Sequence, residues 1–143
     1  MTFITIEQPS PADIDAIHAV LKETYWSPGI PRDVVARACA NSMCAVARDE
    51  GGKLIGFARL VTDKATFAWL CDVIVLPGKQ GRGLGRALVQ TFQNLPELRG
   101  LRRWLLGTKD AHGVYEPLGF SSLAAPQRLM EIKNPEPYGL KAS

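Results

Sequence analysis

Residues 73–86 read VIVLPGKQGRGLGR and constrain the fold of this chain more than any other stretch. An apolar, β-branched run ends at Pro77, a basic glycine-rich loop follows, and an apolar-periodic helix begins inside that loop. Glycines let a backbone approach a ligand closely, and the first N–H groups of a helix carry a partial positive charge. This order of strand, loop and helix therefore predicts a site for a pyrophosphate.

The glycine spacing differs from that of both common nucleotide-binding loops. The stretch lacks the Lys-Ser/Thr ending of a P-loop, and its glycines fall at positions 81, 83 and 85 rather than as G-x-G-x-x-G. Arg82 and Arg86 add positive charge near the start of the helix, where cations oppose the helix dipole unless an anion joins them. An anion site is therefore the favoured interpretation, and a basic turn with solvated arginines is the alternative.

Two segments together resemble the GNAT superfamily of N-acetyltransferases. The run QGRGLG at 80–85 is similar to the family motif Q/R-x-x-G-x-G/A, and AHGVYEPLGF at 111–120 is similar to its A-x-x-x-Y-x-x-x-G-F segment. They follow the family's order, with one expected helix and one expected strand between them, and the resemblance covers roughly residues 3–133. It implies an α/β (α+β) fold of the acyl-CoA N-acyltransferase type, with a mixed, mostly antiparallel sheet flanked by helices, and acetyl-CoA as cofactor.

The hydrophobic pattern by itself predicts an α/β domain with a mixed sheet. We expect strands at 3–6, 43–48, 53–61, 67–76, 103–107 and 128–133. We expect one helix that begins at Pro11, behind an N-cap at Ser10. Three further helices are expected at 33–40, 84–93 and about 110–118. Gly56 inside a strand predicts a bulge or the close approach of another element. All 143 residues are expected to form one domain with an irregular tail at about 134–143.

The resemblance also implies which residues hold acetyl-CoA. In the family, the strand before the glycine loop splays away from the next strand, and backbone groups in the gap pair with the pantetheine arm as an added strand would. The corresponding gap here lies between 73–75 and 105–108. Thr108 stands where the family often has an asparagine that touches the cofactor. The expected cofactor-binding residues are Val73, Ile74, Val75, Gln80, Gly81, Arg82, Gly83, Leu84, Gly85, Arg86 and Thr108.

The implied chemistry is direct attack of a neutral primary amine on the thioester carbonyl. The resemblance assigns Tyr115 to the leaving thiolate, because a phenol donates a proton without introducing a charge, and assigns the Val75 N–H to the developing oxyanion. The alternative for Tyr115 is a packed side chain with its hydroxyl on the surface. We therefore expect N-acetyl transfer to a small molecule or peptide, and the alternative is a non-catalytic coenzyme A-binding module or sensor.

The general base depends on how Asp72 is interpreted. It is the one acid in the strand at 67–76, where acidic residues are depleted, so it could relay a proton or could be structural. In related polyamine-type acetyltransferases two acids stand in tandem, and here Cys71 replaces the first. Strand alternation predicts that Asp72 points away from any site on the face of Trp69 and Cys71. His112 is a second candidate base.

Aromatic residues near a helix break are candidates for the acceptor site. Tyr25 and Trp26 precede a Pro/Gly turn at 27–29, and they could be core anchors or walls of a substrate-binding pocket. Together with Trp69, and with Phe67 nearby in sequence, they indicate a pocket for an apolar or aromatic amine.

Composition bounds the remaining possibilities. The formal net charge of +3 is mild for a nucleic-acid-binding protein, so the basic cluster at 99–103 is interpreted as a solvated approach to a strand. We find neither an apolar run of transmembrane length nor a signal-peptide pattern, and expect a cytoplasmic protein without nucleic-acid or membrane partners. Three cysteines without a C-x-x-C pair and two scattered histidines predict no metal site. If the domain self-associates, a homodimer is the expected assembly.

Overall fold

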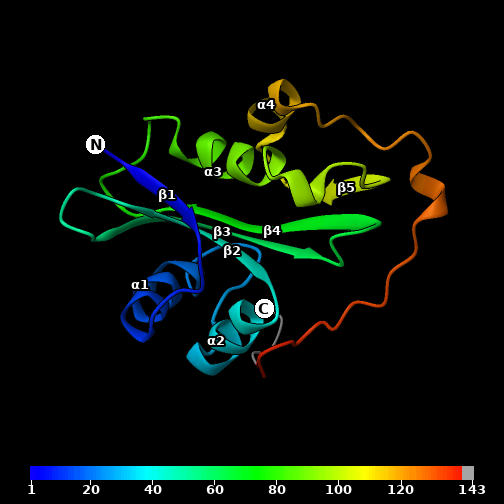
Figure 1. The fold of residues 1–143 in the computed structure, drawn as a ribbon. Helices are drawn as coiled ribbons and strands as arrows, with labels where there is room; N and C mark the ends of the chain where they lie inside the picture. The colour runs from blue at the N-terminus through cyan, green and yellow to red at the C-terminus, as the bar shows by residue number, and fades with distance from the viewer. Residues whose placement is uncertain (140–143) are drawn as a thin grey trace.

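The computed structural model describes residues 1–139, and these contain a five-stranded sheet (Figure 1). The strand order is β1-β2-β3-β4-β5; neighbours from β1 to β4 are antiparallel, whereas β4 and β5 are parallel. The sheet is therefore mixed and mostly antiparallel, which confirms the predicted fold class. The strands are β1 (Phe3–Ile6), β2 (Met43–Arg48), β3 (Leu54–Thr62), β4 (Phe67–Val75) and β5 (Arg103–Leu106).

Helices cover both faces of the sheet (Figure 1). On one face lie α1 (Pro11–Leu21) and α2 (Arg32–Ala40), and on the other lie α3 (Leu84–Gln93) and α4 (His112–Tyr115). No helix within residues 1–139 is both long enough and apolar enough to cross a membrane. Short 3-10 turns complete the secondary structure: η1 (Pro96–Leu98), η2 (Glu116–Leu118) and η3 (Pro126–Arg128). The crossover from β4 to β5 runs through α3, as a parallel pair requires.

The start of α1 is fixed by its capping residues. Ser10 Oγ accepts a hydrogen bond from the Asp13 N–H at 3.1 Å, and Asp13 Oδ2 accepts one from the Ser10 N–H at 2.9 Å. This capping box satisfies groups that a helix start otherwise leaves unpaired. Pro11 occupies the first turn, where its missing N–H removes no helical hydrogen bond. The predicted N-cap is confirmed.

Two apolar layers hold the helices onto the sheet. On the α3 side, Leu88 and Phe92 are fully buried against β2, β3 and β4. On the α1–α2 side, Ile17 and Val35 pack with Phe57 of β3. Full burial of a side chain of this size contributes about 1.5–3 kcal/mol, so the fold rests on both layers.

Gly56 in β3 lets α3 come close to the sheet. A Cβ added at this position would lie 3.0 Å from Leu84 Cδ2 and 3.3 Å from Leu88 Cδ1, which is tighter than ordinary van der Waals contact. The β2–β3 register also shifts here, because Ala47 pairs with Gly56 whereas Arg48 pairs with Leu54. Both features predicted for Gly56, the bulge and the close approach, are present.

The predicted strand at 128–133 is wrong. Between η3 and residue 139 the chain pairs with no strand of the sheet, and Met130 and Ile132 are 97% and 103% exposed. An apolar alternating segment becomes a strand only where a neighbouring strand accepts its backbone hydrogen bonds, and this segment stands away from β5 (Figure 1).

The other C-terminal elements also differ from their predicted form. The helix predicted at about 110–118 is a single α-helical turn, α4, followed by η2, because Pro117 has no N–H with which to continue an α-helix. Residues 135–139 of the expected irregular tail form bends and turns, and residues 140–143 lie outside the described residues.

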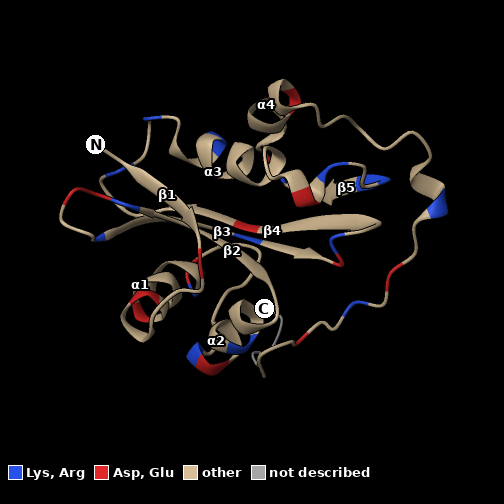
Figure 2. Cartoon of the chain, in the orientation of Figure 1, with Lys and Arg blue, Asp and Glu red and all other residues tan. Residues whose placement is uncertain are grey.

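Most charged residues belong to loops and helices (Figure 2). A basic and an acidic position lie in the middle of β3 and β4; these are Arg59 and Asp72, which are partners in the strand register. Buried charges are rare unless paired, so this pair marks the polar part of the sheet.

Candidate active site

A β-bulge interrupts β4 at Cys71. Arg59 of β3 pairs with Asp72, but the next residue of β3, Leu60, pairs with Leu70. Cys71 therefore has no partner on β3. The extra residue shifts the alternation of side chains along β4 by one position.

The bulge brings Trp69 and Asp72 to the same face of the sheet. Before the bulge, Leu70 packs in the α3 core, so Trp69 points to the α1–α2 side; after it, Ile74 packs in the α1–α2 core and Asp72 shares that side. The prediction that Asp72 points away from the face of Trp69 assumed an uninterrupted strand. It is wrong for this reason, and both residues line one pocket.

β4 extends beyond its pairing with β5. Residue pairs from Phe67–Arg103 to Leu70–Leu106 join the two strands, and β5 ends there. Beyond the bulge at Cys71, residues 72–75 pair only with β3 among the described strands. An extended ligand could therefore pair with this half of β4 as an added strand would. The half contains three of the predicted cofactor-binding residues, Val73, Ile74 and Val75.

The glycine loop leaves the start of α3 open. Gly83 is the N-cap residue, in the left-handed conformation at φ 72° and ψ 15°, which favours glycine. Within residues 1–139 no side chain caps this helix end, and its first turn holds no acidic residue. Arg82 and Arg86 flank it. Helix N–H groups, the helix dipole and two guanidinium groups together suit a bound anion.

Gln80 holds the loop against the end of β4. Its Nε2 donates to the Val75 carbonyl oxygen at 3.3 Å, and its Oε1 accepts from the Gly78 N–H at 3.1 Å. Gly78 and Gly81 have φ angles of 84° and 82°, so two further loop positions need the left-handed region. Gln80 thus has a structural contact besides the cofactor role expected for it.

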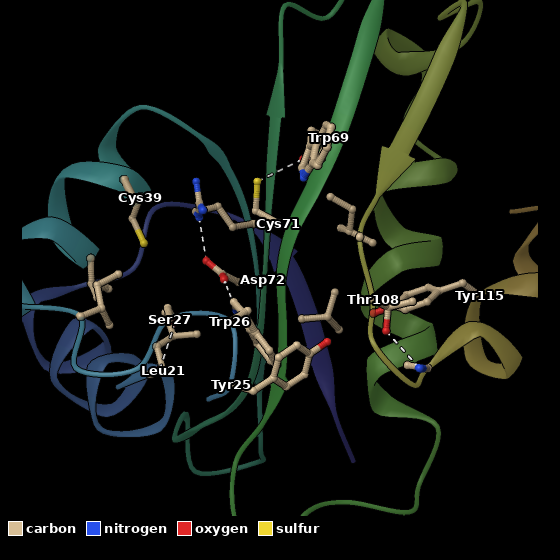
Figure 3. A pocket seen from close by; sticks show the side chains of 18 of the residues that line it. Leu21, Tyr25, Trp26, Ser27, Cys39, Trp69, Cys71, Asp72, Thr108 and Tyr115 are labelled. Carbon is tan, nitrogen blue, oxygen red and sulfur yellow. Dashed lines mark hydrogen bonds and ion pairs between the residues drawn. The ribbon is translucent and has the colours of Figure 1, made fainter. Parts of the chain in front are cut away.

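A pocket of about 440 Å³ opens on the α1–α2 side, next to the bulge (Figure 3). The α1–α2 loop, the middle of β4 and the segment after β5 line it, although they are far apart in the sequence. Val73 also lines it, so the pocket reaches the part of β4 that has no neighbouring strand on the β5 side. Phe67 and His112 are not among the lining residues. The predicted site residues that the pocket brings together are Tyr25, Trp26, Trp69, Asp72, Val73, Thr108 and Tyr115.

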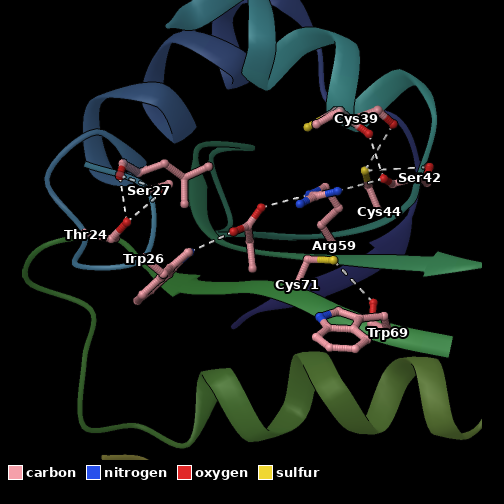
Figure 4. A network of polar contacts seen from close by, with 12 residues as sticks. Thr24, Trp26, Ser27, Cys39, Ser42, Cys44, Arg59, Trp69 and Cys71 are labelled. Carbon is pink, nitrogen blue, oxygen red and sulfur yellow. Dashed lines mark hydrogen bonds and ion pairs between the residues drawn. The ribbon is translucent and has the colours of Figure 1, made fainter. Parts of the chain in front are cut away.

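Asp72 is the centre of a buried polar network (Figure 4). It is 7% exposed, its Oδ2 accepts from Arg59 Nε at 2.8 Å, and its Oδ1 accepts from Trp26 Nε1 at 2.9 Å. Arg59 Nη1 in turn donates to Ser42 Oγ at 3.1 Å. Both carboxylate oxygens are engaged in holding Arg59 and Trp26, which favours the structural interpretation of Asp72.

Tyr115 ends α4 and lines the pocket as a half-buried side chain. Its ring packs edge-to-face on Phe120, with the ring centroids 5.9 Å apart. Burial, and to a lesser extent the neighbouring Tyr25, raises the pKa of Tyr115, so the phenol stays protonated at neutral pH. A protonated phenol in a pocket can donate a proton to a leaving group.

Two hydrogen bonds order the segment after β5. The Lys109 N–H donates to Tyr25 Oη at 2.9 Å, and the Ala111 N–H donates to Thr108 Oγ1 at 3.0 Å. The Tyr25 ring packs edge-to-face on Trp26, with the centroids 5.1 Å apart. The bond between Tyr25 and Lys109 therefore ties the α1–α2 loop to the opposite wall of the pocket.

The lining residues that sequence reasoning missed include Arg59 and Tyr138. A partial signal existed for Arg59, because a charged residue interrupts an apolar strand. Its pairing with Asp72 follows only from the bulge, since an uninterrupted register would place Arg59 opposite Cys71. Tyr138 reaches the pocket from the C-terminal segment and packs against the α1–α2 core. No local signal marks Tyr138, since its position depends on the path of the chain before it.

Comparison with known proteins agrees with this geometry. The family model described as "Acetyltransferase (GNAT) family" matches residues 12–120. An inferred acetyltransferase from Gibberella zeae is 29% identical over 140 residues, which cover 82% of this chain and 78% of that protein. Other curated relatives are longer: the chain spans 44% of a histone acetyltransferase from Glycine max, to which it is 35% identical over 102 residues, or 60% of this chain.

Solved structures extend the likeness to the whole fold. The crystal structure of a GNAT-family protein from Xanthomonas campestris pv. campestris is 40% identical, superposes with a TM-score of 0.91, and covers 98% of both chains. An aminoglycoside N-acetyltransferase in complex with CoA superposes with a TM-score of 0.66 over 94% of this chain and 96% of that chain; at 19% identity the likeness is one of fold. This chain therefore belongs to the acetyltransferase (GNAT) family.

Proposed function

We propose that this protein transfers an acetyl group from acetyl-CoA to a primary amine on a small molecule or peptide, by direct attack of the amine. One observation carries the proposal. A single pocket joins the aromatic side chains of Tyr25 and Trp26, the phenol of Tyr115, and Val73 in the part of β4 that lacks a neighbour on the β5 side. These three parts suit an acceptor, a leaving group and a cofactor arm, in that order.

The residues present fit acetyl-CoA. Its pyrophosphate needs N–H donors and positive charge, which the open start of α3, Arg82 and Arg86 offer. Its pantetheine arm needs an unpaired strand edge, which 71–75 offers. When bound, acetyl-CoA supplies the acetyl group as an activated thioester. The residues that we assign to holding it are Val73, Ile74, Val75, Gln80, Gly81, Arg82, Gly83, Leu84, Gly85, Arg86 and Thr108.

Tyr115 is the proton donor in this proposal. Its raised pKa keeps the phenol protonated at neutral pH. The O–H could then give its proton to the sulfur as the C–S bond breaks, and the phenolate would be reprotonated by the proton that the amine nitrogen loses on forming the amide. Burial also raises the pKa of the Cys71 thiol in the same pocket, which keeps that thiol protonated and a poor nucleophile. These groups support direct attack by the amine over a route through an acyl-cysteine.

Asp72 acts as a positioning residue, through Trp26 and Arg59. The double variant Arg59→Met with Asp72→Leu removes the ion pair without leaving a buried charge unpaired. We expect this variant to raise KM for the amine, because Trp26 loses its hydrogen-bond acceptor, and to keep kcat within about tenfold. A general base contributes about 100-fold or more, so a loss of that size in kcat would instead identify Asp72 as the base.

The acceptor carries an apolar or aromatic group next to its amine. Tyr25, Trp26 and Trp69 line the pocket, and aromatic side chains favour flat apolar partners in stacked or edge-to-face contact. An acceptor screen in which only polyamines or aminoglycosides are acetylated would contradict this part of the proposal.

The test is coenzyme A release from acetyl-CoA, followed with a thiol reagent. The full chain is assayed with aromatic amines, amino acid derivatives, peptides and polyamines, and products are identified by mass spectrometry. We expect release that requires an amine, and an acetylated product. Acetyl-CoA binding without turnover on any amine would instead support the non-catalytic coenzyme A-binding alternative.

A further inference from the structure

Among residues 1–139, three charged side chains line the pocket, and two of them neutralise each other. Arg59 Nε donates to Asp72 Oδ2 at 2.8 Å, so this guanidinium and this carboxylate form an ion pair. The third is Asp110, which is exposed. Within residues 1–139 its carboxylate accepts no hydrogen bond and forms no ion pair. The described lining therefore carries one uncompensated negative charge.

Asp110 belongs to the wall of the pocket that also carries Tyr115. The segment that follows β5 contributes Thr108 and Asp110 to the lining, and Tyr115 follows them at the end of α4. Thr108 and Tyr115 lie on one side of the pocket and Asp72 on the other (Figure 3). Asp110 thus comes from the side that carries the phenol assigned to the leaving thiolate, where the acceptor nitrogen must attack.

Hydrogen bonds on both sides of Asp110 fix its backbone. The Lys109 N–H donates to Tyr25 Oη at 2.9 Å, and the Ala111 N–H donates to Thr108 Oγ1 at 3.0 Å. The neighbouring ammonium of Lys109 lies over the Tyr25 ring, with Nζ 5.7 Å from the ring centroid. The backbone at Asp110 is therefore held in place, while its carboxylate stays available to a ligand.

The aromatic walls of the pocket favour the same charge as Asp110. Tyr25, Trp26 and Trp69 all line it. The negative face of an aromatic ring attracts an ammonium group, and a carboxylate accepts charge-assisted hydrogen bonds from one. An alkylamine carries this positive charge at neutral pH, as a lysine side chain does, whereas an arylamine or arylhydrazine is neutral. The two kinds of acceptor should therefore interact differently with this lining.

The two other acid–base candidates are poorly placed to meet the acceptor amine. Both carboxylate oxygens of Asp72 are engaged, one by Arg59 and the other by Trp26. His112 does not line the pocket. Asp110 is therefore the carboxylate of the described lining whose oxygens are open to a ligand.

We propose that Asp110 binds the ammonium group of the acceptor and selects amines that are cations at neutral pH. This inference rests on the proposed acetyl transfer and narrows its acceptor to an alkylamine that carries an aromatic group. The ammonium donates N–H hydrogen bonds to the Asp110 carboxylate. One proton then leaves the nitrogen for the solvent that this exposed side chain contacts, and the neutral amine attacks the thioester carbonyl.

The test compares benzylamine with phenylhydrazine, which have nearly the same shape, at neutral pH and saturating acetyl-CoA. Benzylamine is a cation under these conditions and phenylhydrazine is neutral. We expect Asp110→Asn to lower kcat/KM for benzylamine by about tenfold or more, through KM, and to change that for phenylhydrazine by about twofold at most. Asp110→Glu keeps the negative charge and should keep the preference for benzylamine. KM for acetyl-CoA should be the same in all variants.

The matched control is Glu116→Gln, which removes the same charge from an exposed residue next to Tyr115 that does not line the pocket. It should change kcat/KM for either acceptor by about twofold at most. An equal loss for both acceptors in Asp110→Asn, or no loss for either, would overturn the proposal and leave acetyl transfer standing. So would a wild type that acetylates other amines but not benzylamine. No transfer to any amine would overturn the proposed function, and this inference with it.

Discussion

The two halves of β4 differ in what lies beside them. Residues 67–70 pair with β3 on one side and β5 on the other, and Leu70 is 4% exposed in the α3 core. Residues 72–75 follow the bulge at Cys71 and pair with β3 alone among the described strands, and Asp72 and Val73 line the pocket. The edge of β4 that faces β5 is thus covered by that strand along the first half, which we call the closed half, and is uncovered along the second, the open half. Stability and ligand binding can therefore reside in different halves of one strand.

The largest expected effect breaks the closed half. Leu70→Ala should lower the free energy of unfolding by about 2–5 kcal/mol, because it leaves a cavity in a packed core. Val73→Ala, in the open half, should cost about 1 kcal/mol or less, because Val73 is only half-buried. Urea denaturation measures both values. Equal losses at the two positions would contradict the contrast between the halves.

The next effect falls on the chemistry beside the open half. Tyr115→Phe should lower kcat by about 100-fold, equivalent to about 2.7 kcal/mol, and should leave the unfolding midpoint unchanged, because only the phenol proton is lost. Tyr138→Phe is the matched control, since it removes a hydroxyl from the same pocket. Steady-state kinetics with saturating acetyl-CoA measure both. An undiminished kcat in Tyr115→Phe would remove this residue from the mechanism.

The ion pair between Arg48 and Asp13 lies outside the pocket, so its loss should change stability and leave acetyl transfer unchanged. The hydrogen bond from Arg48, at 2.7 Å, lowers the pKa of Asp13 from 3.8 to about 2. Because the folded-state pKa is depressed, the stabilisation of about 2 kcal/mol is fully present above about pH 4 and is lost as the pH falls through about 2.

The variant Asp13→Asn tests this pH dependence. The difference in unfolding free energy between wild type and variant should be largest above about pH 4 and should shrink towards pH 2, as Asp13 becomes protonated. Urea denaturation at pH 5, 4, 3 and about 2 measures it. Acetyl transfer at neutral pH should be unchanged. A difference that does not depend on pH would contradict the role of the Arg48 hydrogen bond.

The smallest expected effect concerns the hydrogen bond between Tyr25 and the Lys109 N–H, which links two walls of the pocket. Tyr25→Phe removes the acceptor of the Lys109 N–H in a 52% exposed side chain, so about 1 kcal/mol or less is lost. We expect KM for the amine or for acetyl-CoA to rise by about fivefold at most, with kcat unchanged. Initial-rate measurements separate the two parameters. A fall in kcat comparable with that of Tyr115→Phe would give Tyr25 a part in the reaction itself.

The elements that sequence predicted well have local causes. Ser10 caps α1 through residues within one turn, and Gly83 begins α3 because its own backbone is left-handed. The bulge at Cys71 has no such cause, since it exists only in the pairing of β3 with β4. The segment at 128–133 carries a strand pattern, but a strand also needs a neighbour, which the pattern does not reveal.

The candidate site shows the same division. Tyr115 and the glycine loop follow from motifs, so their positions could be expected from the family resemblance. The face on which Asp72 lies, and its contact with Arg59, depend on strand register and could not be read from alternation. Tyr138 joins the pocket through a long exposed arm, which places it beyond any local rule.

The most direct measurement is thermal unfolding with and without acetyl-CoA, on wild type, Gly83→Glu and Gly100→Glu. Both glycines have positive φ, 72° and 84°, and open space around a Cβ, so the two substitutions impose similar strain, one at the start of α3 and the other after η1, outside the proposed cofactor site. A ligand at 100 times its dissociation constant stabilises by about 2.7 kcal/mol. The open half of β4 and the start of α3 predict a shift of several degrees in wild type and Gly100→Glu, and none in Gly83→Glu. No shift in wild type, or an equal shift in all three proteins, would contradict the account.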